Sequence, residues 1–531
     1  MKNSIFSTSI ENWLISYGEI FFRPESTHGA KIHVSEAAGK LAFIYEKIRN
    51  TIDYKEDHLI RKSAIARIVK RVLTTGKKGS DLALPLIEEL ISARYLPNGQ
   101  IAETAVNRVR DILNKYIVIY NAIVDRGFCK EESKDFFVWL VKLLSSEIEE
   151  FLVPDPESRI TVDAMQRVVR QAVVIEKNRK IDVTEKNIQI YIAVMKSLLK
   201  ADEVTIDYHL IKYYFPNWSE LALQDAEGIA VDVKNKQAVI KRHYDHFLNE
   251  RLTKEFKKYA VVFWMLQQII VDNRGDCMSI FQNRKLLSDA IAKVCAAKYK
   301  TIKGKVRRAI VRSVIYIFLT KIIFGILLEL PFDYFILQSL DWLPLGINAI
   351  FPPAMMAFIG LSINTPKKNN TDEIIKEAFA IVYNDAGQEH IVKLPKHRKN
   401  FTGFILKFFY LVMYAVSFGA IIYGLRKIDF SIASMAIFLL FLTMVSFFSL
   451  RIMKNARELI ILQKKENFRA VILTFLAIPI LRVGRWISLN SSKINIFIFI
   501  FDFIIEAPFK MFVRIFEDLI VYIKEKRDEM M

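Results

Sequence analysis

Apolar residues recur every three or four positions over most of the first 300 residues. Val106, Val109, Leu113, Tyr116 and Tyr120 follow this spacing, which places them on one face of a helix. Prolines and an Asn-Arg-Gly-Asp turn separate further stretches of the same kind, as expected between helices. The predicted helices cover residues 35–48, 58–73, 80–95, 131–151, 162–176, 185–199, 237–271 and 280–297.

No convincing alternation of apolar and polar residues, the pattern of a strand, occurs in this amino-terminal part. About 300 residues can bury a sizeable core. The two prolines between Val153 and Glu157 mark the most plausible internal boundary. We therefore expect two helical bundles, over residues 1–153 and 154–300.

From residue 301 onward, several apolar stretches are long enough to cross a bilayer. Residues 430–450 carry no charge, and as a helix they would be about 31 Å long, which matches the hydrocarbon thickness. Residues 309–330, 342–363 and 401–423 are further predicted spans. The fold class expected is therefore all-α: a large cytosolic helical domain followed by a polytopic α-helical membrane domain over 301–531, with four firm spans.

Two further apolar segments, 471–481 and 494–507, are short for independent spans. They predict either a re-entrant hairpin or a thin pair of spans. After Pro508, apolar residues such as Phe512 and Phe516 recur on one face and charged residues such as Lys510 and Arg514 on the other. This pattern predicts an interfacial amphipathic helix over 508–527.

Basic residues give the expected orientation. The chain carries a net charge of +19, and cytosolic flanks of membrane helices are enriched in Lys and Arg. A basic segment just before the first predicted span places the amino-terminal part in the cytosol. We expect four of its residues to contact anionic lipid headgroups: Lys303, Lys305, Arg307 and Arg308.

The loops agree with this orientation, with one exception. The connection 331–341 has no Lys or Arg, so it is expected outside, whereas the basic loop 364–400 is expected inside. The short connection 424–429 carries Arg426 and Lys427 and disagrees. We expect both termini in the cytosol and the protein in the inner (plasma) membrane. Within the inner loop, the pattern predicts a helix over 371–380 and a short hairpin that includes a strand over 389–394.

Composition and motifs narrow the function classes. Apolar residues make up 52% of the chain and charged residues 25%, which excludes global disorder. The three cysteines are far apart and form no CxxC pair, which argues against a zinc ribbon or a disulfide framework. The sequence lacks a P-loop, GxGxxG, HExxH, GxSxG or kinase motifs. We therefore expect no catalytic residues, no metal and no cofactor.

Lys321 is the sharpest candidate for a functional residue. It lies near the middle of the first predicted span, where a lysine costs roughly 2.5–3.5 kcal/mol on insertion scales, so we expect a partner. Glu329 follows eight residues later, about 80° around an ideal helix. Asp502 and Glu506 are alternatives if the last segments pack against this span. The lysine either belongs to a substrate or proton path or, as we favour, forms a structural ion pair.

The second predicted span contains another unusual feature. Pro352 and Pro353 follow Asn348 by about one turn, and prolines at these positions predict a break in the helix. Broken helices build binding sites in transporters, but ordinary kinks have the same sequence. We favour the ordinary kink, because no matching break or inverted repeat is found elsewhere.

Two weaker patterns lie in the amino-terminal part. His243, His246 and Glu250 have the spacing of metal ligands on one helix, although such sites need ligands from other helices as well. A basic helix and loop could be a solvated surface, a contact for anionic lipid or a nucleic-acid site, in that order of preference. Its residues are Arg61, Lys62, Arg67, Lys70, Arg71, Lys77 and Lys78.

These patterns favour a non-enzymatic, multi-pass membrane protein that displays a cytosolic helical docking or scaffold domain. Its expected partners are the bilayer, with its anionic headgroups, and a protein or a second copy of the chain, but not nucleic acid. The alternative is a small-solute or ion transporter or channel that uses Lys321 and the second span. A membrane enzyme that acts on lipid precursors is third, because no nucleophile–base pair or carboxylate pair stands out.

Overall fold

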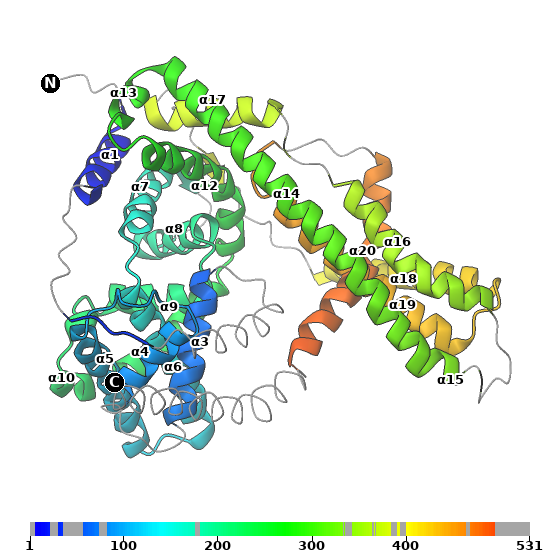
Figure 1. The fold of residues 1–531 in the computed structure, drawn as a ribbon, viewed down its shortest axis with the longest axis horizontal. Coiled ribbons are helices and arrows are strands. Elements are labelled where there is room, and N and C mark those ends of the chain that lie inside the picture. The colour runs from blue at the N-terminus through cyan, green and yellow to red at the C-terminus, as the bar shows by residue number, and fades with distance from the viewer. Residues whose placement is uncertain are drawn as a thin grey trace, which may run out of the picture. The chain divides into compact units, whose positions relative to one another are not determined.

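In a computed structural model of the chain, the described residues are mainly helical and include two short strands (Figure 1). β1 (Val173–Ile175) and β2 (His390–Val392) pair in parallel. The all-α fold class is therefore confirmed. The structure describes residues 6–21, 30–34, 57–73, 82–175, 181–332, 334, 342–363, 366, 368–383, 390–392, 400–462 and 468–493.

The chain forms two compact units, which divide inside a helix at Ala260. The amino-terminal unit contains residues 8–260 together with β2. The carboxy-terminal unit contains residues 261–387 and 393–496 and the first seven residues. The domain boundaries expected near residues 153 and 300 stay predictions.

The amino-terminal unit is built from amphipathic helices that pack against one another. In α5 (Thr104–Asp125), the predicted seam is buried at Val109, Leu113 and Tyr116. Its other helices are α1 (Thr8–Phe21), α3 (Asp57–Leu73), α4 (Ala83–Ser92), α6 (Lys130–Leu152), α7 (Pro156–Ala172), α8 (Val183–Leu198), α9 (Glu203–Tyr214), the 3₁₀ helix η2 (Trp218–Glu220), α10 (Leu223–Gly228), α11 (Ala230–Tyr244) and the first half of α12 (Asn249–Asp272).

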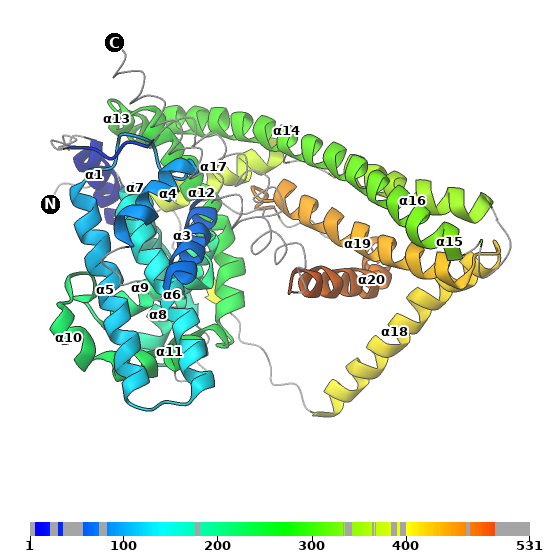
Figure 2. The same ribbon diagram turned by 60° about the horizontal axis from the view of Figure 1, so that its bottom comes forward.

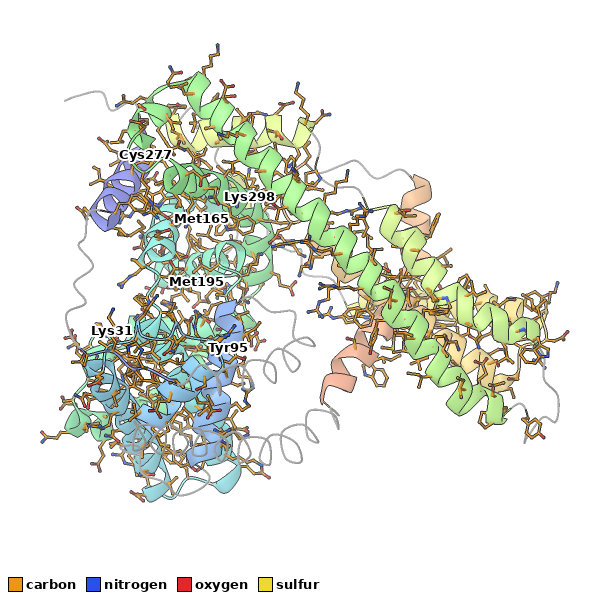
Figure 3. All side chains as sticks on the ribbon, in the orientation of Figure 1. Lys31, Tyr95, Met165, Met195, Cys277 and Lys298 are labelled. Carbon is orange, nitrogen blue, oxygen red and sulfur yellow. The ribbon has the colours of Figure 1, made fainter. Side chains whose placement is uncertain are left out.

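Specific packing explains where several of these helices lie. α6 packs against both α3 and α5, and α7 packs against α1 and α8. Met165 of α7 and Met195 of α8 are almost fully buried (Figure 3). Pro156 occupies the first position of α7, where the missing N–H of proline costs no hydrogen bond. Six of the predicted helices are confirmed by α3 to α8.

One predicted helix is wrong. Residues 237–271 are not continuous, because α11 ends at Tyr244 and α12 begins at Asn249. The Asn249 side chain donates to the carbonyl oxygens of His243 and Tyr244, at 3.4 and 3.5 Å. It thereby adds a donor to two carbonyl groups at the end of α11, where carbonyls have no partner one turn further along the helix. The helices α9 and α10 were not predicted, and the predicted helix 35–48 lies outside the described residues.

The carboxy-terminal unit is organised around α14 (Arg284–Phe324), a helix of 41 residues. The Asn283 side chain caps its start by accepting from the N–H groups of Lys285 and Leu286. A π-helical segment, η3 (Gly325–Glu329), continues it. The other helices are α13 (Cys277–Gln282), α15 (Leu330–Phe332), α16 (Trp342–Leu361), α17 (Lys368–Tyr383), α18 (Asn400–Arg426), α19 (Ile432–Ala456) and α20 (Phe468–Lys493).

Three of these helices are long and apolar enough to cross a membrane: α16, residues 408–426 of α18, and α19. They match three of the four predicted spans. The remaining one, 309–330, coincides with the end of α14 and with η3, and it stays a prediction. The predicted segments 494–507 and 508–527 lie outside the described residues.

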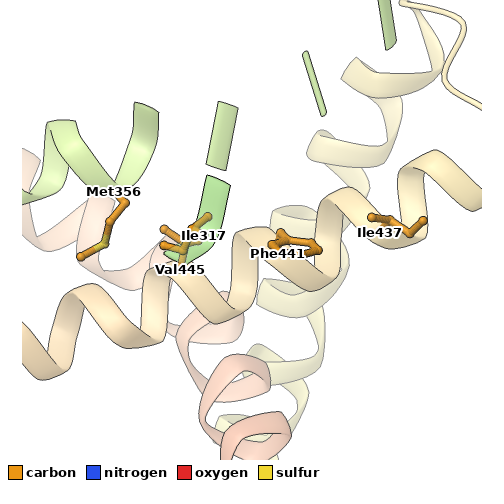
Figure 4. Close-up of a cluster of buried hydrophobic side chains, with 5 residues drawn as sticks. All are labelled: Ile317, Met356, Ile437, Phe441 and Val445. Atoms are coloured by element: carbon orange, nitrogen blue, oxygen red, sulfur yellow. The ribbon is translucent and has the colours of Figure 1, made fainter. Parts of the chain in front are cut away.

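Side chains from three helices form a common core in the carboxy-terminal unit. α14, α16 and α19 lie side by side (Figure 2). Ile317 of α14 and Met356 of α16 meet Ile437, Phe441 and Val445 of α19 in one buried cluster (Figure 4). This core fixes the three helix faces that carry the polar residues described below.

The loop 364–400 holds more structure than expected. The predicted helix 371–380 is confirmed by α17. Its Asn370 side chain donates to the hydroxyl of Tyr299 in α14, at 3.0 Å, and to the carbonyl oxygen of Leu459, at 2.8 Å. The predicted strand 389–394 is matched by β2, which pairs in parallel with β1. The turn of the predicted hairpin lies outside the described residues, so the hairpin itself stays a prediction.

Candidate functional site

Four buried polar residues come together in the carboxy-terminal unit. They are Lys321 of α14, Glu329 at the end of η3, Asn348 of α16 and Ser434 of α19, and each is at most 2% exposed. We refer to them as the polar cluster. The structure thus brings together three of the predicted polar residues and adds Ser434, which the sequence did not indicate.

The π-helical segment explains how Glu329 reaches Lys321. In an ideal α-helix the two residues would lie about 80° apart. Between Gly325 and Glu329 the chain is π-helical, with hydrogen bonds that span five residues instead of four. Each residue then advances by a smaller angle, so Glu329 turns back toward the face of Lys321. The two side chains meet with Nζ 3.2 Å from Oε2.

Every strong donor in the polar cluster is directed at the Glu329 carboxylate. Lys321 Nζ donates to Oε2, while the Ser434 hydroxyl donates to Oε1 at 2.6 Å. Asn348 Nδ2 donates to the same Oε1 and to the carbonyl oxygen of Ser434. The ammonium group of Lys321 lies 5.2 Å from the ring centre of Phe441, a favourable cation–π position. The cluster is therefore a neutral, hydrogen-bonded pair of opposite charges.

One atom of the polar cluster lacks a partner within the described part of the chain. Asn348 Oδ1 is buried and accepts no hydrogen bond. The predicted helix break does not appear at this point, because α16 stays helical through Pro352 and Pro353, both buried. The prolines offer no N–H to the carbonyl groups of Asn348 and Ala349. This part of α16 therefore has more acceptors than donors.

The geometry of the polar cluster limits its chemistry. Glu329 already accepts three hydrogen bonds and Lys321 is held against it, so neither is placed as an open base or nucleophile. Asn348 Oδ1 can accept from a water molecule, which commonly satisfies such groups. Among the described residues, no group of three or more His, Cys, Asp or Glu could hold a metal ion.

The other predicted membrane-side residues divide into two groups. All four headgroup candidates, Lys303, Lys305, Arg307 and Arg308, are exposed on α14, where they are available to charged partners. Asp502 and Glu506 lie outside the described residues. The pairing of Lys321 with Glu329 leaves no need for either carboxylate as its partner.

The predicted metal-ligand spacing does not form one helical face. His243 is the last but one residue of α11, His246 lies in the turn that follows and Glu250 is the second residue of α12. His243 instead pairs with Glu185, with Nδ1 3.1 Å from Oε1, and its Nε2 lies 2.8 Å from the Tyr214 hydroxyl. Internal contacts thus account for this histidine.

Several basic residues of the helix α3 form ion pairs with other parts of the amino-terminal unit. Arg61 pairs with Glu149 at 2.7 Å and Arg71 pairs with Glu89 at 2.6 Å. Lys62 is 5% exposed and pairs with Asp202, which caps α9. These residues stabilise helix packing, which leaves fewer basic groups for lipid or nucleic acid than the sequence indicated. Lys77 and Lys78 lie outside the described residues.

A second buried ion pair, which the sequence did not reveal, lies in the amino-terminal unit. Lys115 Nζ is 2.6 Å from Glu147 Oε1 and donates to the carbonyl oxygen of Trp218 at 2.8 Å. The other carboxylate oxygen accepts from the Tyr116 hydroxyl and the Trp218 indole. Burial lowers the pKa of Lys115, although Glu147 opposes this shift, and burial also raises the pKa of Tyr116. Lys115 sits on the otherwise apolar face of α5, beside Tyr116, and that position is the only sequence signal.

Asp207 is a buried carboxylate of the same unit that accepts its hydrogen bonds from neutral groups. The Tyr244 hydroxyl donates to it at 2.5 Å and the Trp139 indole at 2.8 Å. Burial raises the pKa of Asp207 to about 6, and the nearby Glu203 and Asp202 add to the effect. No pattern in the sequence indicated this residue.

Comparison with known proteins adds no assignment to these residues. The chain matches no protein-family model, and neither a curated protein nor a solved structure resembles it significantly. The functional argument therefore rests on the residues themselves.

Proposed function

We propose that the chain is a multi-pass integral membrane protein that displays a helical docking domain in the cytosol and has no enzymatic role. Three helices with the length and apolarity to cross a membrane support this proposal. The observation that carries it is the closed polar cluster around Lys321 and Glu329. A transport site must expose its charges to a moving solute, whereas these two side chains are each 1% exposed and face each other.

The polar cluster also supports a fourth span over residues 309–330. A lone lysine or a lone glutamate at this depth would oppose insertion. When Lys321 and Glu329 pair, the two charges cancel, and Asn348 and Ser434 donate to the Glu329 carboxylate as well. They then join α14, α16 and α19, so the proposed role of the cluster is to hold the membrane helices together.

The proposed orientation follows the basic residues. The exposed Lys303, Lys305, Arg307 and Arg308 precede the first span and would face the anionic leaflet on the cytosolic side. Both termini and the loop 364–400 would share that side, in the inner (plasma) membrane.

A docking role for the amino-terminal unit is supported by the way it uses its polar groups. Glu147, Lys115, Asp207 and His243 are all engaged in internal hydrogen bonds. None is presented in an open site where a substrate could reach it. The surface of the unit is what remains for recognition, and its proposed partner is a protein or a second copy of the chain.

Reporter fusions test the topology on which this proposal depends. A reporter inserted at Ser339 should be found outside and one at Lys368 inside, because the predicted first and second spans bracket the outer connection. Enzymatic reporters that are active on only one side of the membrane give this result directly. Two reporters on the same side would contradict the four-span topology.

A second candidate function, a proton- or ion-linked transporter, is favoured by the unpartnered Asn348 Oδ1 beside a buried charge pair. Lys321→Met separates the two functions. The docking protein should lose thermal stability in detergent and show no flux before or after the change. A transporter should keep its stability and lose a flux measured in reconstituted vesicles.

A further inference from the structure

Two arginines of α20 lie within the proposed membrane-spanning bundle, where an unpaired positive charge is unfavourable. Arg482 and Arg485 are both exposed, and residues three apart share a helix face. No described carboxylate pairs with either of them. Two like charges one turn apart repel each other, and an anion between them would relieve this repulsion.

The contacts of α20 place these arginines near the middle of the neighbouring helices. At Gly484, between the two arginines, a Cβ atom would overlap the carbonyl oxygen of Thr443, so the backbones of α20 and α19 touch there. Thr443 lies next to the midpoint of α19. Throughout this region α20 packs against α19.

A second contact agrees with this depth. The hydroxyl of Ser417 donates to the carbonyl oxygen of Leu476 at 3.0 Å. Ser417 is the midpoint of the apolar stretch 408–426 of α18. The middle of α20 is therefore held at mid-height by both of its neighbours.

The side chains around the arginines suit a headgroup-like anion. The guanidinium of Arg482 lies 5.1 Å from the ring centre of Tyr410, which orients it by a cation–π contact. Trp486, next to Arg485, is 66% exposed. Tyr and Trp are the aromatic residues most often found beside lipid headgroups, so they suit a headgroup drawn inward to this depth. Guanidinium groups also match the geometry of phosphate oxygens with paired N–H donors.

We propose that Arg482 and Arg485 together bind a phosphate group, drawn into the membrane thickness along the exposed face of α20. This inference rests on the proposed function, because the depth of the arginines follows from α18 and α19 crossing the bilayer. The phosphate belongs either to an anionic phospholipid or to free phosphate in a water-filled recess, and the experiment below distinguishes these sources.

The test uses the full-length protein, purified in a non-ionic detergent without phosphate. A short-chain phosphatidylglycerol is titrated in while the midpoint of thermal unfolding is recorded, because a ligand of the folded state raises that midpoint. The midpoint of the wild type should rise. In Arg482→Gln/Arg485→Gln the apparent affinity should weaken about tenfold or more, since two charge-assisted contacts are lost.

A matched control is the double variant Arg426→Gln/Lys427→Gln, whose residues lie at the carboxy-terminal end of α18. It removes the same charge, and Lys427 also lies over a tyrosine ring, 5.0 Å from the centre of Tyr423. This variant should respond to the lipid like the wild type. Equal loss in both double variants would overturn the proposal, because net charge alone would then explain the effect.

A parallel titration with inorganic phosphate identifies the source. If free phosphate raises the midpoint of the wild type but not of the arginine variant, the site takes free phosphate. If only the lipid does so, it takes a lipid headgroup. If neither ligand moves the wild type, or if the variant responds equally, the proposal is wrong. Should the double variant fail to fold, Arg485→Gln alone tests the same point, because it keeps the contact of Arg482 with Tyr410.

A depth measurement keeps this test separate from the proposed function. A spin label at Leu440, in a chain whose three cysteines are replaced by serine, should be protected from water-soluble quenchers and accessible to oxygen in vesicles. A water-exposed label would reject the spanning helix α19 and with it the proposed function. A buried label with no phosphate response would reject the phosphate site alone.

Discussion

The two buried lysine–carboxylate pairs use similar chemistry in different surroundings. Glu147 and Glu329 each accept from a lysine and from two neutral groups. Each lysine also lies over an aromatic ring, Trp218 for Lys115 and Phe441 for Lys321. The pairs differ in what surrounds their charges after unfolding. The charges of the first pair enter water, whereas under the proposed topology those of the second pair remain in lipid.

This difference decides how much each pair contributes to stability. A charge released into water regains its hydration, which offsets much of the attraction that the pair provides. A charge that remains in a membrane after helix separation still finds polar partners there, which reduces the measured coupling. Burial alone therefore does not decide which ion pair contributes more to stability, because the surroundings of the charges in the unfolded state matter as well.

The largest expected effect is at Lys115. Lys115→Met leaves the Glu147 carboxylate buried with neutral donors only, so the free energy of unfolding should fall by about 3–5 kcal/mol. Chemical denaturation of the full-length protein in detergent, followed by the tryptophan fluorescence of the amino-terminal unit, measures the change. The control Lys115→Met/Glu147→Gln should recover most of the loss. A double variant as unstable as the single one would show that the methionine, rather than the stranded charge, causes the damage.

Asp207 sharpens the comparison because its hydrogen-bond donors carry no charge. Its pKa is raised to about 6 in the folded protein, so the folded state binds this proton more tightly than the unfolded state. Stability should therefore fall as the pH rises from about 4 to about 7, by about 2–3 kcal/mol from this group. Asp207→Asn should lack that component, so the difference between the two proteins should grow with pH. A constant difference over this range would contradict the raised pKa.

A double-mutant cycle at the polar cluster tests the role of the unfolded state. Lys321→Met, Glu329→Gln and the combined variant should show a coupling energy of about 1 kcal/mol when unfolding is driven by a denaturing detergent. The coupling energy of the matching cycle, Lys115→Met with Glu147→Gln, should be several times larger. If the coupling at Lys321 instead reached the range expected for Lys115, the comparison drawn above would fail.

The smallest effect is expected at an exposed pair. Lys376 and Glu373 of α17 are 3.7 Å apart, and the lysine side chain is 76% exposed. Glu373→Gln should change the free energy of unfolding by less than about 0.5 kcal/mol. The same denaturation experiment measures it and sets the baseline for a charge lost at the surface. A larger change would mean that the effects at the buried pairs cannot be assigned to burial.

The sequence predicted those features that can be recognised from a residue and its near neighbours along the chain. Lys321 stands out because its neighbours are apolar, and the helices α3 to α8 follow from the spacing of their apolar residues. Lys115 does not stand out, because α5 carries many charges and its burial depends on partners more than thirty and one hundred residues away. A long-range partner cannot be inferred from spacing along one helix.

Other misses have equally local causes. The break between α11 and α12 has no proline or glycine, and the Asn249 side chain donates to the helix end instead. β1 is three residues long, too short for an alternating pattern. The π-helical segment has no sequence signature, so the approach of Glu329 to Lys321 could be proposed but its angle could not be derived. Ser434 was missed because a serine in an apolar helix carries no distinctive spacing.

The length of α14 has a mechanical consequence. A helix of 41 residues is about 60 Å long and curves gently (Figure 2), as long helices do. No loop interrupts it between the Asn283 cap and Lys321, so a twist or push applied at one end arrives at the other with little loss. The α-helical rod ends where η3 begins, and η3 continues it without a loop. Glu329 sits at the far end of that segment, so any torsion carried along α14 is delivered to the ion pair itself.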